Sequence, residues 1–270
     1  MCMNENDVRD LKKAVRLLEN PSIGAKIAGI VGISIEKSIA LLPNKATQAI
    51  DSAAQKAIYG ALRLSLRTLE PHNPRLETEP PKASNGWHIA ATAVTGAIGG
   101  AFGLLALTVE LPISTTIMMR SIADVARSEG ADLKDLQTQL ECVQVLAFGG
   151  PTSNDDAAEI GYFVAREAMT KAVSEAAAHI AKSGLQKESA PAIVRLITKI
   201  ADRYSISVTE KAGAQLVPAL GAVGGALINT VFIDHFQDMA RGHFTIRRLE
   251  KQYSHELVRQ KYLEFKQLIA

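Results

Sequence analysis

The chain has 270 residues, of which 47% are hydrophobic and only 5% are aromatic. This composition favours helices over sheets, and the length supports one large domain or two small ones with a sizeable core. The 21% of charged residues argue against disorder. Because 30 basic and 28 acidic side chains leave a net charge of +2, we exclude a nucleic-acid binder that relies on phosphate neutralisation.

The first quarter of the chain predicts three apolar helical segments followed by a loop. Apolar residues recur at helical spacing over residues 7–20 and 46–69. Between them, residues 23–42 are mostly apolar, and small residues such as Gly29 are spaced so that helices can approach closely. Residues 71–86 contain four prolines and predict a loop.

Two long segments are rich in Ala and Gly and nearly uncharged. Residues 89–119 contain a single carboxylate, Glu110, and residues 212–233 contain no charged side chain. Their length permits a membrane span, but small and hydroxyl side chains gain little on leaving water. We therefore expect two apolar helices whose glycines, such as Gly225, lie at close helix contacts. A protein with two membrane spans is the alternative.

The second half of the chain predicts four further helical segments. They cover residues 132–147, with Asp132 as the N-cap, residues 155–182, residues 189–204, and a basic amphipathic C-terminal helix over residues 245–270. No period-two strand pattern persists in the sequence. The fold class is therefore expected to be all-α, a multi-helix bundle of about nine helices.

The two uncharged segments resemble each other. Residues 96–101 match residues 221–226, and residues 122–127 are similar to residues 236–241. The two offsets differ by 11 residues, about three helical turns, which keeps both motifs on one helix face. A degenerate internal repeat explains this similarity, and chance matching in low-complexity sequence is the alternative.

The cysteines and the N-terminal residues indicate a reducing compartment. Cys2 and Cys142 form no CxxC motif, so they predict neither a disulfide framework nor a zinc site. Residues 1–20 alternate charged and apolar side chains and lack the features of a secretory signal. We expect a cytoplasmic protein, and no motif predicts a metal or cofactor.

The tightest polar cluster lies between residues 234 and 243. On a helix, Asp234, His235 and Asp238 adjoin one another, so a metal site or an acid–base pair is geometrically accessible. We favour a structural interpretation in which Asp238 and Arg241 form a local ion pair while His235 caps or packs. The alternative is a metal-dependent hydrolase that uses Asp234, His235, Asp238 and His243, with Glu110 as a further candidate.

Glu110 is the only carboxylate in its segment and must pair, neutralise or face water, because burying a lone charge is costly. We expect a buried ion pair with Arg120 or Arg241, next to a helix break at Pro112. Lining a polar spot in a lipid groove is the alternative role.

Several long strings are similar to the signatures of the bacterial EcsC family, namely residues 111–130, 141–150, 217–229 and 234–244. The resemblance runs from about residue 49 to the C-terminus. It implies an EcsC-like helical domain over residues 46–270, which includes the Pro-rich loop 71–86, preceded by an N-terminal helical extension over residues 1–45.

What the resemblance implies about function is limited. The family takes its name from a gene beside an ABC transporter operon linked to protein secretion, and it provides no catalytic residues to carry over. The resemblance and the polar cluster together define a candidate polar site: Glu110, Arg120, Asp124, Arg127, Asn229, Asp234, His235, Gln237, Asp238, Arg241 and His243.

Our leading hypothesis is a non-enzymatic helical protein that associates peripherally with the cytoplasmic face of a membrane. The apolar helices would meet lipid, or enclose an acyl chain, and the C-terminal helix would meet anionic headgroups. A transporter or secretion component is the expected protein partner. The candidate membrane-binding side chains are Arg247, Arg248, Arg259 and Lys261.

Overall fold

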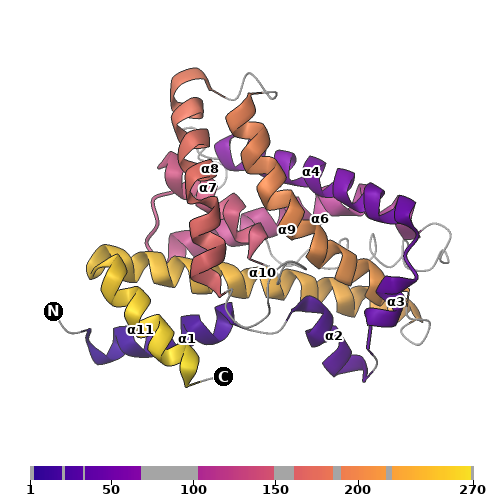
Figure 1. Ribbon diagram of the computed structural model, residues 1–270, viewed down its shortest axis with the longest axis horizontal. Coiled ribbons are helices and arrows are strands. Elements are labelled where there is room, and N and C mark those ends of the chain that lie inside the picture. The colour runs from indigo at the N-terminus through magenta and orange to yellow at the C-terminus, as the bar shows by residue number, and fades with distance from the viewer. Residues whose placement is uncertain are drawn as a thin grey trace, which may run out of the picture.

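The computed structural model describes residues 3–19, 22–32, 34–67, 103–148, 161–184, 190–216 and 221–268. Over these residues the fold is all-α, as the sequence predicts, with ten α-helices, one 3-10 helix and no strand (Figure 1). In chain order the elements are α1 (Glu5–Leu18), α2 (Ile23–Val31), α3 (Glu36–Ala40), α4 (Asn44–Arg67), α6 (Gly103–Ser128), α7 (Leu136–Gln144), η2 (Val145–Ala147), α8 (Tyr162–Ser183), α9 (Pro191–Gln215), α10 (Gly221–Gln252) and α11 (His255–Gln267).

The centre of the molecule is built from α4, α6, α9 and α10. Of these, α10 is the longest at 32 residues, about 48 Å at 1.5 Å per residue. Helices α6 and α10 run in the same direction, because Glu110 and Phe232 both contact Lys211 of α9, while Glu129 contacts Arg248 further along both helices. The buried residues of these helices form one continuous apolar core.

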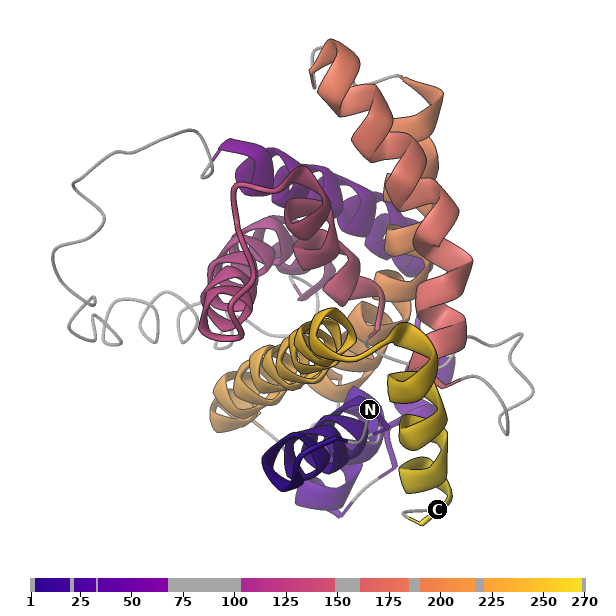
Figure 2. The same ribbon diagram turned by 90° about the vertical axis from the view of Figure 1, so that its left-hand side faces the viewer.

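Different helices cover the two ends of α10. Helices α1 and α11 lie beside its C-terminal half (Figure 2), where Tyr262 of α11 donates a hydrogen bond to Glu19 at the end of α1. At the other end, α2 and α3 pack against the last turns of α9. The Gly24 amide at the start of α2 donates to Glu210 of α9.

Several helix boundaries correct the sequence-based expectations. Helix α9 continues to Gln215 rather than ending at residue 204, so the uncharged segment 212–233 is divided between α9 and α10. Helix α7 is capped by Asp135, whose side chain accepts from the Thr138 amide, and not by Asp132. Helix α8 begins at Tyr162 and ends before Gly184 in the left-handed region (φ 63°).

The expected break at Pro112 is wrong, because α6 passes through this residue. The residues around Pro112 are well packed. Leu111 and Thr115 are buried, and the Thr115 hydroxyl donates to the Leu111 carbonyl. Tertiary packing of this segment therefore outweighs the hydrogen bond that proline removes.

The single C-terminal helix expected over residues 245–270 is also wrong. Helix α10 ends at Gln252, and Ser254 caps a separate helix by accepting from the Leu257 amide. This break lets α11 fold back against α1.

Close helix contacts occur at glycines other than those expected. A Cβ atom on Gly29 or Gly225 would meet no atom of the described residues within 4 Å, so neither glycine lies at a close helix contact within this part of the chain. A Cβ on Gly242 of α10 would instead lie 2.5 Å from Leu18 Cγ, and one on Gly213 of α9 would overlap Ile39. These glycines let α1 and α3 approach the central helices.

The two similar motifs of the sequence adopt the same local structure in parallel helices. Asp124 and Arg127 form an ion pair on α6 at 3.4 Å, and Asp238 and Arg241 form one on α10 at 3.2 Å. The expected loop 71–86, residues 96–101 and the first residues of the expected helix 155–182 lie outside the described residues. Among the helices that the structure describes, none has the length and apolar character needed to cross a membrane.

Candidate functional site

The side chains of the polar cluster at residues 234–243 belong to two separate sets of contacts. Lys26 of α2 approaches one part, with its Nζ atom 3.2 Å from His235 Nδ1 and 3.8 Å from Asp238 Oδ2. Burial lowers the pKa of Lys26, and the charges of Asp238 and Asp234 oppose this shift. His235 is buried, and His243 lies two turns further along α10 in a different network.

The remaining residues of the candidate polar site lie at separate places on α6 and α10. The Asp238–Arg241 ion pair is present as expected, and Arg241 also donates to Gln237. Arg120 and the Asp124–Arg127 pair are exposed on α6. Over the described part of the chain, no three His, Cys, Asp or Glu side chains lie close enough to hold a metal ion. The hydrolase alternative therefore has no metal-ligand geometry to support it.

Glu110 has a different partner from the two arginines expected. Lys211 Nζ of α9 lies 2.7 Å from Glu110 Oε1, and its ammonium lies 4.8 Å from the centre of the Phe232 ring. The pKa of Lys211 is lowered by burial, and Glu110 counteracts this shift. Two further buried atoms in α9 and α10, Ser207 Oγ and Asn229 Oδ1, have no hydrogen-bond partner among the residues that the structure describes. The sequence patterns did not predict Lys211, which directly precedes the uncharged segment, as the partner of Glu110.

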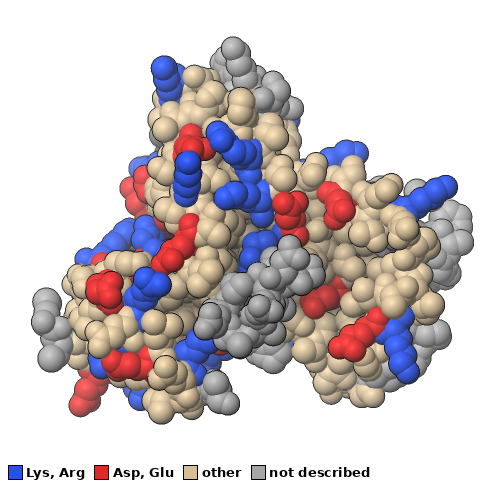
Figure 3. All heavy atoms as spheres, viewed as in Figure 1, with Lys and Arg blue, Asp and Glu red and all other residues tan. Residues whose placement is uncertain are grey.

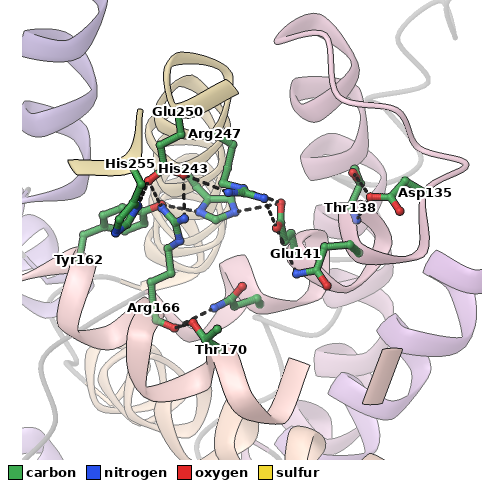
Figure 4. Close-up of polar contacts among 12 residues, drawn as sticks. Asp135, Thr138, Glu141, Tyr162, Arg166, Thr170, His243, Arg247, Glu250 and His255 are labelled. Carbon is green, nitrogen blue, oxygen red and sulfur yellow. Dashed lines mark hydrogen bonds and ion pairs between the residues drawn. The ribbon is translucent and has the colours of Figure 1, made fainter. Parts of the chain in front are cut away.

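His243 belongs to a buried network of hydrogen bonds between α8 and α10 (Figure 4). Its Nδ1 atom lies 2.7 Å from the Tyr162 hydroxyl, which also accepts from Arg166. Arg166 binds Glu250 through two hydrogen bonds of 2.9 and 2.7 Å. Burial, followed by the charges of Arg166 and Arg247, holds the pKa of His243 well below its usual value. His243 is therefore neutral near pH 7.

Arg247 extends this network to α7. Its guanidinium donates to Glu141 Oε2 at 3.1 Å and to Glu250 at 3.0 Å, and it lies within ion-pair distance of Glu141 Oε1 at 2.9 Å. Burial would raise the pKa of Glu250, but Arg166, His255 and Arg247 together hold it below the usual value. The His243 Nε2 atom is fully buried, has no hydrogen-bond partner in the described part of the chain and lies 3.9 Å from Glu141 Oε2.

A cavity of about 270 Å³ lies beside this network, between the end of α6, the start of α7 and the last turns of α10. Its lining contains three acidic and three basic side chains, so no single charge dominates. The lining residues are Glu129, Gly130, Ala131, Asp135, Thr138, Glu141, Phe244, Arg247, Arg248, Lys251 and Gln252.

The four basic residues expected to meet anionic headgroups all have carboxylate partners. Arg247 binds Glu141 and Glu250, Arg248 binds Asp7, Asp10 and Glu129, Arg259 binds Glu167 and Lys261 binds Glu264. Acidic and basic side chains are likewise interspersed over the part of Figure 3 that contains α1 and α11. The four cations of the C-terminal residues are therefore compensated by carboxylates and are not free to meet an anionic surface.

Large apolar side chains are instead exposed where α2, α3 and the end of α9 meet. Leu41 is 77% exposed, Ile30 is 57% exposed and Leu216 is 40% exposed. Lys37 of α3 and Lys45 in the first turn of α4 are exposed, and among the residues described neither has a carboxylate within ion-pair distance. We call Ile30, Leu41 and Leu216 the apolar end.

Comparison with known proteins identifies a family for most of the chain. The sequence model of the EcsC protein family matches residues 5–249. The match includes α1 to α3. The similarity to the family therefore begins well before residue 49, where the resemblance was expected to begin. A domain boundary at residue 45 stays a prediction. No curated protein and no solved structure matches the chain.

Proposed function

The chain belongs to the EcsC protein family, and from this premise we propose that it is a non-enzymatic helical protein that associates peripherally with the cytoplasmic face of a membrane. The contact would be made by the apolar end and not by the basic C-terminal residues. The resemblance to a family linked with a transporter operon adds an accessory role in transport or secretion to this proposal.

The observation that carries the proposal is the exposure of three large aliphatic side chains on adjoining elements. Leu41, Ile30 and Leu216 are each at least 40% exposed, although the core of the same molecule buries most of its Leu and Ile side chains. Transferring one such side chain completely out of water is worth about 1.5–3 kcal/mol. A few of them inserted at the level of the headgroups can hold a protein at an interface.

The charge around the apolar end suits the same role. Lys37 and Lys45 flank Leu41 in the sequence, and their ammonium groups lack carboxylate partners in the part of the chain that the structure describes. Interfacial segments combine inserted apolar side chains with flanking cations that meet anionic lipid. Lysine stems can also lie along the apolar surface while their charged ends reach water.

Flotation with liposomes tests the proposal directly. In the triple variant Ile30→Gln/Leu41→Gln/Leu216→Gln, we expect binding to vesicles with anionic lipid to fall at least about tenfold, which corresponds to 1.4 kcal/mol. The matched control is Leu263→Gln/Leu268→Gln on α11, since these side chains are 47% and 79% exposed at the other end of the molecule. Equal losses in both variants, or no loss in the first, would contradict the proposal.

The accessory role requires a separate test in cells. Deleting the gene is expected to lower secretion of exported proteins, and the wild-type gene is expected to restore it. The triple variant, expressed at the wild-type level, should fail to do so while the α11 control variant succeeds. Full restoration by the triple variant would separate any role in secretion from membrane binding.

A further inference from the structure

The cavity beside α7 is built from side chains that are already held in place. Arg248 is fixed by Asp10 at 2.7 Å and by Glu129 at 2.9 Å, and Arg247 is fixed by Glu141 and Glu250. These contacts come from α1, from the residue that follows α6 and from α7, and they converge on the last turns of α10. The basic part of the lining is therefore preorganised and needs little reordering to accept a ligand.

Two of the six charged lining residues have no oppositely charged partner among the described residues, and they differ in sign. Lys251 is exposed and its ammonium makes no ion pair. Asp135 accepts from the Thr138 amide and hydroxyl through the single oxygen Oδ2, which leaves Oδ1 available. The other four charges neutralise one another or their neighbours outside the cavity.

Hydrogen-bond donors also remain unused in the lining. A guanidinium group has five N–H donors. Arg247 uses three of them on Glu141 and Glu250, and Arg248 uses three on Asp7, Asp10 and Glu129. With respect to the described residues, each arginine therefore keeps at least two N–H groups for a further acceptor.

We infer that this cavity binds a small free zwitterion, a molecule that carries an ammonium group and a carboxylate or phosphate group a few bonds apart. The acidic group would be bound by Lys251 and by the remaining N–H groups of Arg247 and Arg248. The ammonium group would be bound by Asp135 Oδ1. A simple anion would meet the carboxylates of the lining and a simple cation would meet its basic groups, so only a ligand with both charges complements the cavity.

The position of the cavity favours a free molecule over a lipid headgroup. The cavity lies at the C-terminal end of α10, whereas α2, α3 and the end of α9 lie toward the other end of this helix (Figure 1). A bilayer that contacts the apolar end would therefore not present its headgroups to the cavity.

Amide chemical shifts of the full chain test this inference. The probes are β-alanine and phosphoethanolamine as zwitterions, and inorganic phosphate and ethanolamine as singly functional controls. We expect at least one zwitterion to shift the amides of residues 135–141 and 247–252 with a dissociation constant below about 1 mM, and each control to bind at least about tenfold more weakly. Binding of phosphate as tight as that of the zwitterions, or no shift with any probe, would overturn the inference.

Variants and vesicles complete the test. Lys251→Gln and Asp135→Asn should each weaken zwitterion binding at least about fivefold, and asparagine keeps the cap of α7. Lys182→Gln and Asp132→Asn alter exposed charges outside the cavity and should leave binding unchanged; equal effects of all four variants would overturn the site. Competition by phosphatidylethanolamine vesicles would assign the ligand to a membrane and contradict the free molecule, whereas absence of competition would support it.

Discussion

The Nζ atom of Lys211 lies 2.7 Å from Glu110 Oε1, and the lysine side chain is completely buried while the glutamate keeps 16% of its surface exposed. Together with the Phe232 ring, this ion pair joins α6, α9 and α10 at one point. A buried charge that loses its partner is costly, whereas removing both charges removes the problem. The pair therefore has a measurable coupling energy.

We expect Glu110→Gln and Lys211→Met each to lower the free energy of unfolding by about 2–4 kcal/mol. The double variant Glu110→Gln/Lys211→Met should lose clearly less than the sum of the two, because no unpaired charge remains. Urea denaturation of the four proteins measures this cycle. Additive losses would show that the two side chains stabilise the fold independently.

The neutral state of His243 predicts a dependence of stability on pH. Burial and the charges of Arg166 and Arg247 hold its folded-state pKa well below 6.5. As the pH falls below about 6.5, the unfolded chain takes up a proton that the folded chain does not. Stability should therefore fall with decreasing pH between about 6.5 and the folded-state pKa, at up to about 1.4 kcal/mol per pH unit.

Comparison of variants assigns this dependence to one residue. The side chain that replaces His243 in His243→Gln cannot titrate. Between pH 7 and pH 5, the free energy of unfolding of this variant should therefore fall less steeply than that of the wild type, by up to about 1.4 kcal/mol per pH unit. The low pKa of the Glu250 carboxyl acts in a lower pH window, below about 4.5, and does not interfere. A slope in His243→Gln identical to that of the wild type would exclude His243 as the source.

The close approach of α1 to α10 predicts opposite effects at two helical glycines. Gly242→Ala would place a Cβ atom 2.5 Å from Leu18 Cγ and should destabilise the protein by about 1–3 kcal/mol through overpacking. Gly60→Ala in α4 would meet no described atom within 4 Å and should stabilise the protein by up to about 1 kcal/mol through helix propensity. Thermal unfolding compares the two, and equal effects would remove the packing explanation.

Local patterns predict most helices of this chain because the relevant interactions are short-range. Pro191 opens α9 in the first turn, where it needs no hydrogen bond, whereas α1 begins at Glu5 with Asn4 as its cap instead of at the expected residue 7. The Asp238–Arg241 pair is local in the same sense and is confirmed. The expected break at Pro112 and the missed break at Ser254 depend on contacts with distant helices that periodicity does not reveal.

The candidate site could be predicted only in part for the same reason. Polar residues near one another in the sequence were easy to group. His243, however, contacts Tyr162 and Glu141, which are more than 80 residues away in the sequence, and Glu110 contacts Lys211, which is 101 residues away. A faint signal was present in α8, where Tyr162 and Arg166 are four residues apart on one face. Single charged residues beside apolar helices, such as Lys211, mark positions where a buried partner must exist.

Variants of the ion-paired C-terminal residues distinguish an effect on stability from an effect on membrane binding. Arg259→Gln/Lys261→Gln removes two partly exposed cations whose partners, Glu167 and Glu264, are also exposed, so stability should change by less than about 1 kcal/mol. If the apolar end is the membrane contact, flotation of this variant with anionic vesicles should equal that of the wild type.

Lys37→Gln/Lys45→Gln is the matched variant, because it removes the same charge beside Leu41. It should weaken the binding of anionic lipid by about 1 kcal/mol per lysine. The reverse ranking of the two variants would return the lipid contact to α11.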